Sequence, residues 1–250
     1  MLQLHFDREA YMLFVFFATI SSYNFHWYLT PHAQSEKIRE QWTATHRHYN
    51  LFFVGIGLVG GIYYFFYFIG HWWALLIASG LTFLYSAPKI NHPLFASLRK
   101  IAVGKTLFLA FVWMYVTTVL PLLISGKSWT LTDFLYCSGQ FFLIYAICIP
   151  FDYRDREDDR MQGIKSMITY FDEKAIDRLF YLSVLLFFLC CLLLYPQGFP
   201  PQVIACLLLP GIILLAIYRT TKRNFSDYLY YFVLDGLMMF SALFTSFLSI

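Results

Sequence analysis

Eight long apolar stretches make up most of this 250-residue chain, and they constrain its fold more than any other feature. A helix that crosses a bilayer needs about 20 predominantly apolar residues. Within lipid the backbone must satisfy its own hydrogen bonds, and a helix does so along a single segment. The sequence therefore predicts an all-α, multi-spanning transmembrane helical bundle. The expected spans are 11–29, 51–69, 72–87, 107–124, 134–151, 179–195, 202–218 and 228–248.

The composition excludes the main soluble classes of protein. Hydrophobic residues make up 59% of the chain and charged residues only 13%, whereas soluble domains carry roughly 25% charged residues. A cytosolic domain, a disordered chain and a small disulfide-rich scaffold are all excluded on this ground. We expect a single transmembrane domain over residues 1–250, surrounded by the lipid bilayer and without a nucleic-acid partner.

The basic residues are concentrated in alternate loops. Of the 18 lysines and arginines, all except Arg8 and Lys127 follow the first, third, fifth or seventh expected span. The positive-inside rule places these loops in the cytoplasm and both termini outside it. We therefore expect an integral, multi-pass protein of the bacterial cytoplasmic membrane.

An acidic loop, FDYRDREDDR at 151–160, directly follows the fifth expected span. If the helix continues to Arg160, Asp152, Asp155 and Asp159 fall within an arc of roughly 60°. Like charges on one helix face repel one another, and carboxylate oxygens are preferred ligands of Mg²⁺. The spacing therefore favours a magnesium site at the mouth of the bundle. The alternative is that the three arginines of the same loop neutralise the acids.

The segment 155–166, DREDDRMQGIKS, resembles the second aspartate-rich motif of the UbiA superfamily of intramembrane prenyltransferases. That motif is a DxxxD core followed by GxK and Ser or Thr. Other landmarks agree in order and spacing, namely LYSAP at 84–88, the basic run at 98–105 and the tyrosine pair at 230–231. The resemblance covers most of the chain.

The resemblance implies a UbiA-like bundle of about eight helices around a central cavity. The family has nine helices, so this chain lacks the family's first helix or begins after it. The implied activity is transfer of a prenyl group from a polyprenyl diphosphate to a membrane-soluble acceptor, for which we expect an aromatic ring. The implied cofactor is Mg²⁺, which neutralises the charge of the leaving diphosphate.

The resemblance also assigns metal ligands to the acidic loop. It implies that Asp155 and Asp159 are catalytic and hold Mg²⁺. Asp152, one turn upstream, is expected to be a further metal ligand or a group that contacts the ligands.

Three basic residues are implied as contacts of the diphosphate, namely Lys165, Arg99 and Lys105. Each of them stands in a loop expected to be cytoplasmic, so the positive-inside rule accounts for them equally well.

The family's first motif, NDxxDxxxD, is degenerate in this chain. The corresponding segment at 24–32 reads NFHWYLTPH. Asn24 matches and is expected to contact substrate, whereas Phe25, Tyr28 and His32 replace the three aspartates. This difference leaves open a second hypothesis, a catalytically inactive isoprenoid-binding membrane protein. A third hypothesis is a transporter, although Asp235 is the only acidic residue well inside a late span.

Overall fold

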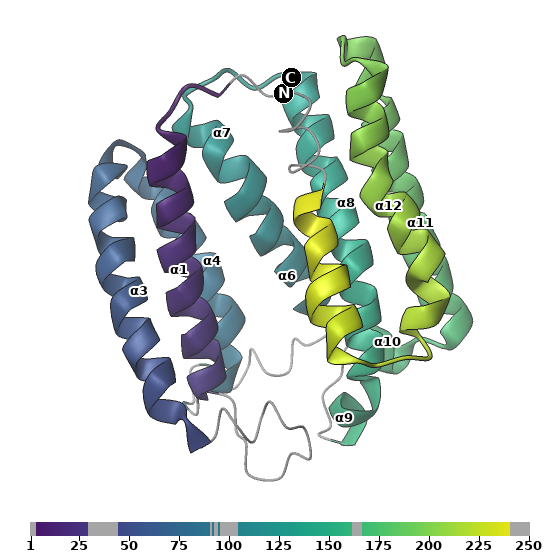
Figure 1. Ribbon diagram of the computed structural model, residues 1–250, viewed down its shortest axis with the longest axis horizontal. Helices are drawn as coiled ribbons and strands as arrows, with labels where there is room; N and C mark the ends of the chain where they lie inside the picture. Colours follow the sequence, from purple (N-terminus) through teal and green to yellow (C-terminus); the bar gives the residue numbers. More distant parts are fainter. Residues whose placement is uncertain are drawn as a thin grey trace. The chain divides into compact units, whose positions relative to one another are not determined.

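A computed structural model of the chain describes residues 4–29, 45–90, 92, 95, 105–161 and 167–240 (Figure 1). Every regular element in these ranges is a helix, which confirms the all-α prediction. A helical segment coincides with each of the eight expected spans.

The helices are described here in chain order. They are α1 (Arg8–Leu29), α3 (Arg47–Tyr67), η1 (Ile69–His71), α4 (Trp72–Ser86), η2 (Ala87–Lys89), α6 (Lys105–Met114), η4 (Tyr115–Val119), α7 (Leu120–Ile124), α8 (Leu131–Arg154), α9 (Arg156–Met161), α10 (Met167–Tyr170), α11 (Glu173–Leu192), η5 (Tyr195–Gln197), α12 (Pro201–Thr221) and η6 (Leu229–Leu234). Two of these elements, η4 and η6, are π-helical turns. The last helix continues beyond η6 to Phe240.

Five helices of the described ranges are long and apolar enough to cross a membrane, and this supports a membrane protein. They are Arg47–Tyr67, Lys105–Ile124, Leu131–Arg154, Glu173–Gln197 and Pro201–Thr221. The expected spans in α1, α4 and the last helix are not among these five, so eight crossings remain a prediction. The orientation of the loops also remains a prediction.

The chain forms two compact units. Within the described residues, unit 1 contains α6, α8 to α12 and η6, and unit 2 contains α1, α3, α4 and α7. The continuous helix Lys105–Ile124 begins in unit 1 and ends in unit 2. The single domain expected over 1–250 stays a prediction.

In unit 2, α1 and α3 lie side by side and run in opposite directions (Figure 1). Asp7 caps the start of α1, because its Oδ1 accepts the backbone N–H of Ala10 at 2.9 Å. The Tyr67 hydroxyl at the end of α3 donates to Asp7 Oδ2 at 2.8 Å. The Ala10 N–H and then the Tyr67 hydroxyl lower the pKa of Asp7, because both stabilise its charged form. At the other end of the pair, Arg47 donates to the Tyr28 carbonyl at 3.1 Å.

Gly57 is the glycine of α3 that meets backbone atoms of α1. A Cβ at this position would lie 2.6 Å from the Ser21 backbone nitrogen and 2.7 Å from the Phe17 carbonyl oxygen. Gly57 and Gly61 are spaced as GxxxG, which is typical of a close helix–helix contact. The structure shows this contact at Gly57, whereas Gly61 has no atom within 4 Å of its would-be Cβ. Gly60 instead faces the Phe17 ring.

We expect Gly57→Ala to weaken the α1–α3 contact by about 1–3 kcal/mol, because backbone atoms block the added methyl group and the helices must separate. The matched control is Gly61→Ala, which adds the same methyl group in open space and should be neutral or slightly stabilising. SDS-induced unfolding in mixed micelles measures both variants. Equal stability of the two variants would contradict a close contact between the backbones of α1 and α3 at Gly57.

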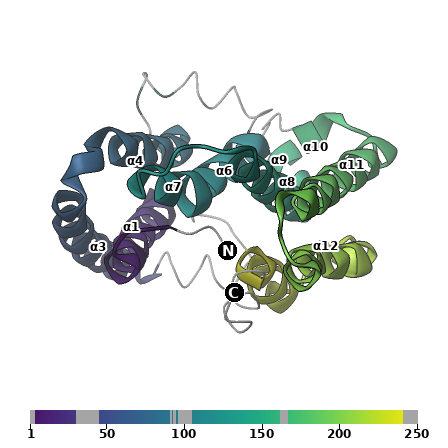
Figure 2. The same cartoon turned by 90° about the horizontal axis from the view of Figure 1, so that it is seen from above.

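In unit 1, α8 lies between α6 and α11 and also contacts α12 (Figure 2). A capping box fixes its start, because Asp133 Oδ2 accepts the Thr130 backbone N–H at 2.9 Å and the Thr130 hydroxyl at 2.6 Å. Half of the residues of α8 are buried, including every residue from Leu143 to Pro150. The part of α8 that leads to the acidic loop is therefore held in place by packing.

Candidate functional site

The acidic motif lies where α8 ends. Arg154 is the last residue of α8, Asp155 is its C-cap with ψ near 2°, and α9 begins at Arg156. The Asp155 N–H donates to the Phe151 carbonyl at 3.1 Å, and the Asp159 N–H donates to the Asp155 carbonyl at 2.9 Å. The predicted continuation to Arg160 is thus present as α9, after a break at Asp155 that the sequence does not signal.

Asp152 connects the end of α8 to the start of α6. Its carboxylate accepts a hydrogen bond from Thr106, which is itself buried. Lys105, the first residue of α6, attracts the carboxylate, whereas Asp155 and Asp159 repel it. The structure therefore brings together four of the residues proposed from sequence, namely Lys105, Asp152, Asp155 and Asp159.

Asp155 is paired with its chain neighbour Arg154. The Nε of Arg154 lies 3.0 Å from Asp155 Oδ1, and their side chains are 13% and 38% exposed. On the surface of α9, Arg160 pairs with Glu157 at 2.9 Å. Arg156 donates to the backbone carbonyl of Phe171 at 2.8 Å. The alternative of internal neutralisation thus holds for two of the arginines in the loop.

Asp159 is almost fully buried, with 7% of its surface exposed. A buried carboxylate costs free energy unless a cation or hydrogen-bond donors compensate it. Asp159 lies in α9, one turn beyond the more exposed Asp155. The motif thus combines a buried carboxylate, that of Asp159, with a partly exposed one, that of Asp155.

The donor chemistry of the acidic motif fits a hard divalent cation. In the described part of the chain, no group of three His, Cys, Asp or Glu side chains is arranged to hold a metal ion. Mg²⁺, however, is usually held by one or two carboxylates, and water and substrate phosphates complete the octahedron. A site of that kind does not require three protein ligands to be assembled in advance.

The remaining residues proposed from sequence lie elsewhere. Lys165 and Arg99 fall outside the described residues. Asn24 belongs to α1 in unit 2, where its side-chain amide donates to the Ile20 carbonyl at 2.8 Å.

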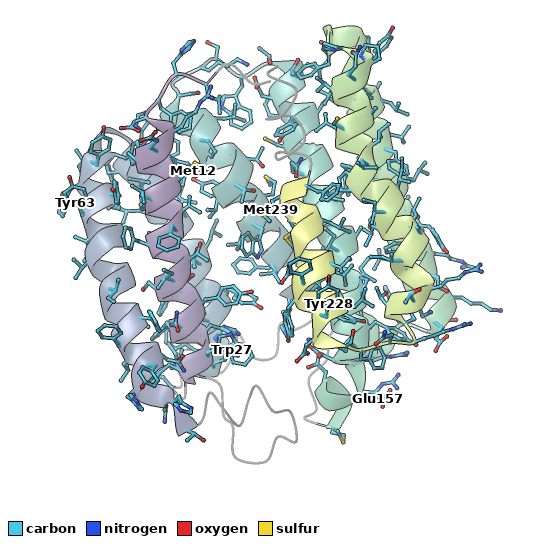
Figure 3. The ribbon with its side chains drawn as sticks, in the orientation of Figure 1. Met12, Trp27, Tyr63, Glu157, Tyr228 and Met239 are labelled. Atoms are coloured by element: carbon cyan, nitrogen blue, oxygen red, sulfur yellow. The ribbon has the colours of Figure 1, made fainter. Side chains whose placement is uncertain are left out.

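Unit 2 contains a polar contact that the sequence analysis missed. The His26 ring stacks on Tyr85 with centroids 5.0 Å apart, and its Nδ1 lies 3.2 Å from the Ser86 hydroxyl. The contact joins α1 to the LYSAP segment at the end of α4. Trp27, labelled in Figure 3, lies near Lys89, whose Nζ is 6.0 Å from the ring centroid.

A second charged network holds the helix ends of unit 1 together. Lys222, which follows α12, lies 3.0 Å from Asp177 on α11, and its Nζ is 4.9 Å from the Tyr153 ring centroid on α8. The Tyr218 hydroxyl donates to Asp177 at 2.6 Å. These contacts fix the end of α8 next to the acidic motif. Figure 3 labels Glu157 and Tyr228 near this end of the unit.

Comparisons with protein-family models, curated proteins and solved structures found no match to this chain. The resemblance to the UbiA superfamily therefore depends on the motif residues themselves.

We expect Thr106→Val to destabilise the protein by about 1–3 kcal/mol, because Asp152 loses a buried hydrogen-bond donor while the replaced side chain keeps nearly the same shape. Thr106→Ser keeps the hydroxyl and is the control. Chemical unfolding in nanodiscs, followed by tryptophan fluorescence, measures both. Equal stability of the valine variant and the wild type would show that the hydrogen bond contributes nothing.

Proposed function

We propose that this chain is a UbiA-like intramembrane prenyltransferase that moves a prenyl group from a polyprenyl diphosphate to a membrane-soluble, aromatic acceptor. The observation that carries the proposal is that Asp152, where α8 ends, interacts electrostatically with Asp155, Asp159 and Lys105. Carboxylates and a lysine at the end of a buried apolar helix suit a ligand with an anionic head and a hydrocarbon tail.

The apolar helices support the choice of an isoprenoid rather than a soluble diphosphate. Five helices of the described ranges are long and apolar enough to cross a membrane. A polyprenyl chain dissolves in the surroundings that such helices require, because each buried methylene contributes about 0.8 kcal/mol. The head group then meets the protein at the polar end of a span.

The acidic residues have distinct roles in this proposal. Asp155 and Asp159 hold Mg²⁺, and Asp152, fixed by Thr106, is the third oxygen ligand or orients the other two. When bound, Mg²⁺ neutralises the charge that develops on the leaving diphosphate. Lys105 adds a positive charge near the same oxygens.

The proposal also extends the family's more detailed features to this chain. They are a bundle of about eight helices around a central cavity, an acidic loop in the cytoplasm, and diphosphate contacts from Lys165, Arg99 and Asn24. The family's motif positions in this sequence support these assignments. The missing aspartates at Phe25, Tyr28 and His32 leave the acidic motif of unit 1 as the principal metal site.

We expect Asp155→Asn and Asp159→Asn each to reduce Mg²⁺-dependent diphosphate release by on the order of 100-fold, because each loses a charged metal ligand. The protein is tested in nanodiscs with prenyl diphosphates of several lengths. Glu157→Gln is the matched control, since Glu157 is an exposed acid of the same loop paired with Arg160. This variant should retain wild-type release.

The outcomes separate the three hypotheses. Donor binding without release, in the presence of Mg²⁺, would favour the inactive isoprenoid-binding protein. Release that is unchanged in both aspartate variants would contradict the assigned site. Absence of both binding and release would contradict the proposed function and reopen the transporter hypothesis.

A further inference from the structure

Arg154 is enclosed by aromatic rings at the end of α8. Its guanidinium carbon lies 4.6 Å from the ring centroid of Tyr230, 5.1 Å from that of Tyr231 and 5.4 Å from that of Phe151. Only 13% of its side chain is exposed. A cation over several ring faces is stabilised by their quadrupoles, and more so when it is desolvated. The position of this guanidinium is therefore well defined.

The enclosed guanidinium is directed at Asp155. Its Nε donates to Asp155 Oδ1 at 3.0 Å, and its Nη2 donates to Oδ2 at 3.5 Å. The same Nη2 donates to the Tyr231 hydroxyl at 3.1 Å. Both carboxylate oxygens are thus contacted by one planar group, a geometry that arginine provides and lysine does not.

We infer that Arg154 is a positioning residue that holds the Asp155 carboxylate in the orientation needed to bind a divalent cation. This inference rests on the proposed function. Asp155 stands at the break between α8 and α9, outside both helices. The three aromatic rings described above hold the Arg154 guanidinium in place, and the guanidinium in turn orients the Asp155 carboxylate.

The arrangement leaves the carboxylate able to coordinate metal. The side chain of Asp155 remains 38% exposed. Hydrogen-bond partners of this kind behind a metal ligand typically change metal affinity or activity by about 10- to 100-fold when they are removed.

A purely structural role for Arg154 is a weaker explanation, because η6 has its own attachment. The Tyr230 hydroxyl donates to the Thr221 carbonyl at 2.8 Å and is fully buried. The Phe151 ring packs edge-on against Tyr230, with centroids 5.1 Å apart. These contacts link η6 to α12 and α8 without the guanidinium.

The experiment measures metal affinity separately from turnover. Full-length Arg154→Gln and Arg154→Lys variants in nanodiscs are titrated with Mn²⁺ by EPR, and the Mg²⁺ concentration that gives half-maximal diphosphate release is determined. In Arg154→Gln we expect the Mn²⁺ affinity to fall by about 10- to 100-fold, and the Mg²⁺ concentration for half-maximal release to rise by the same factor. Arg154→Lys should not restore them, because an ammonium cannot contact both carboxylate oxygens. Release at saturating Mg²⁺ should recover most of the wild-type rate.

Two further variants serve as controls. Arg160→Gln removes an arginine from an exposed ion pair of the same loop, so its metal dependence should equal that of the wild type. Tyr231→Phe keeps the ring and removes only the hydroxyl that Arg154 donates to, and we expect an increase of about threefold in the Mg²⁺ requirement, as for the loss of a modest hydrogen bond.

The outcomes distinguish this inference from the proposed function. An active wild type with unchanged metal dependence in Arg154→Gln would overturn the inference alone. If Arg154→Gln does not fold, Tyr231→Phe decides, and a wild-type metal requirement in that variant would also overturn the inference. A wild type that neither binds Mn²⁺ nor releases diphosphate would overturn both.

Discussion

Polar groups in an apolar bundle need partners, and this requirement organises the ends of the helices in this protein. Where α8 reaches its polar end, the charged side chains meet a neighbour in the chain or a group from another helix. Asp152 meets Thr106 and Lys105, Asp155 meets Arg154, and Lys222 meets Asp177. These charges lie at one end of unit 1, where they hold the helices together and make up the candidate site.

The sequence predicts the helical spans well, because long apolar runs have few alternatives in a membrane. It predicts the contacts within them less well. The GxxxG spacing identifies Gly57 but not Gly60, since the face of α3 that meets α1 depends on how the two helices cross. The break at Asp155 carries no proline or glycine, so nothing in the local sequence marks it.

The same division holds for the candidate site. The aspartate spacing identifies Asp152, Asp155 and Asp159, because helical periodicity is a local property. Thr106 is missed, and Arg154 is expected only to neutralise an acid of its own loop, because their other contacts join α6, α8 and η6, which are distant in sequence. A threonine directly after Lys105 and an arginine beside an aspartate are common and carry no signal alone. The tyrosine pair at 230–231 was a landmark of the family resemblance, and its contact with Arg154 gives it a physical role.

The π-helical turn η6 explains how two consecutive tyrosines can face a single arginine. In an α-helix neighbouring side chains diverge by about 100°, and a turn bonded from i to i+5 contains more residues, so the divergence is smaller. Tyr230 and Tyr231 both lie within 5.1 Å of the Arg154 guanidinium carbon. Deleting one residue from Leu229–Leu234 would return the segment to α-helical pitch and rotate one ring away. The length of this turn, and not only its aromatic content, therefore determines the surroundings of Arg154.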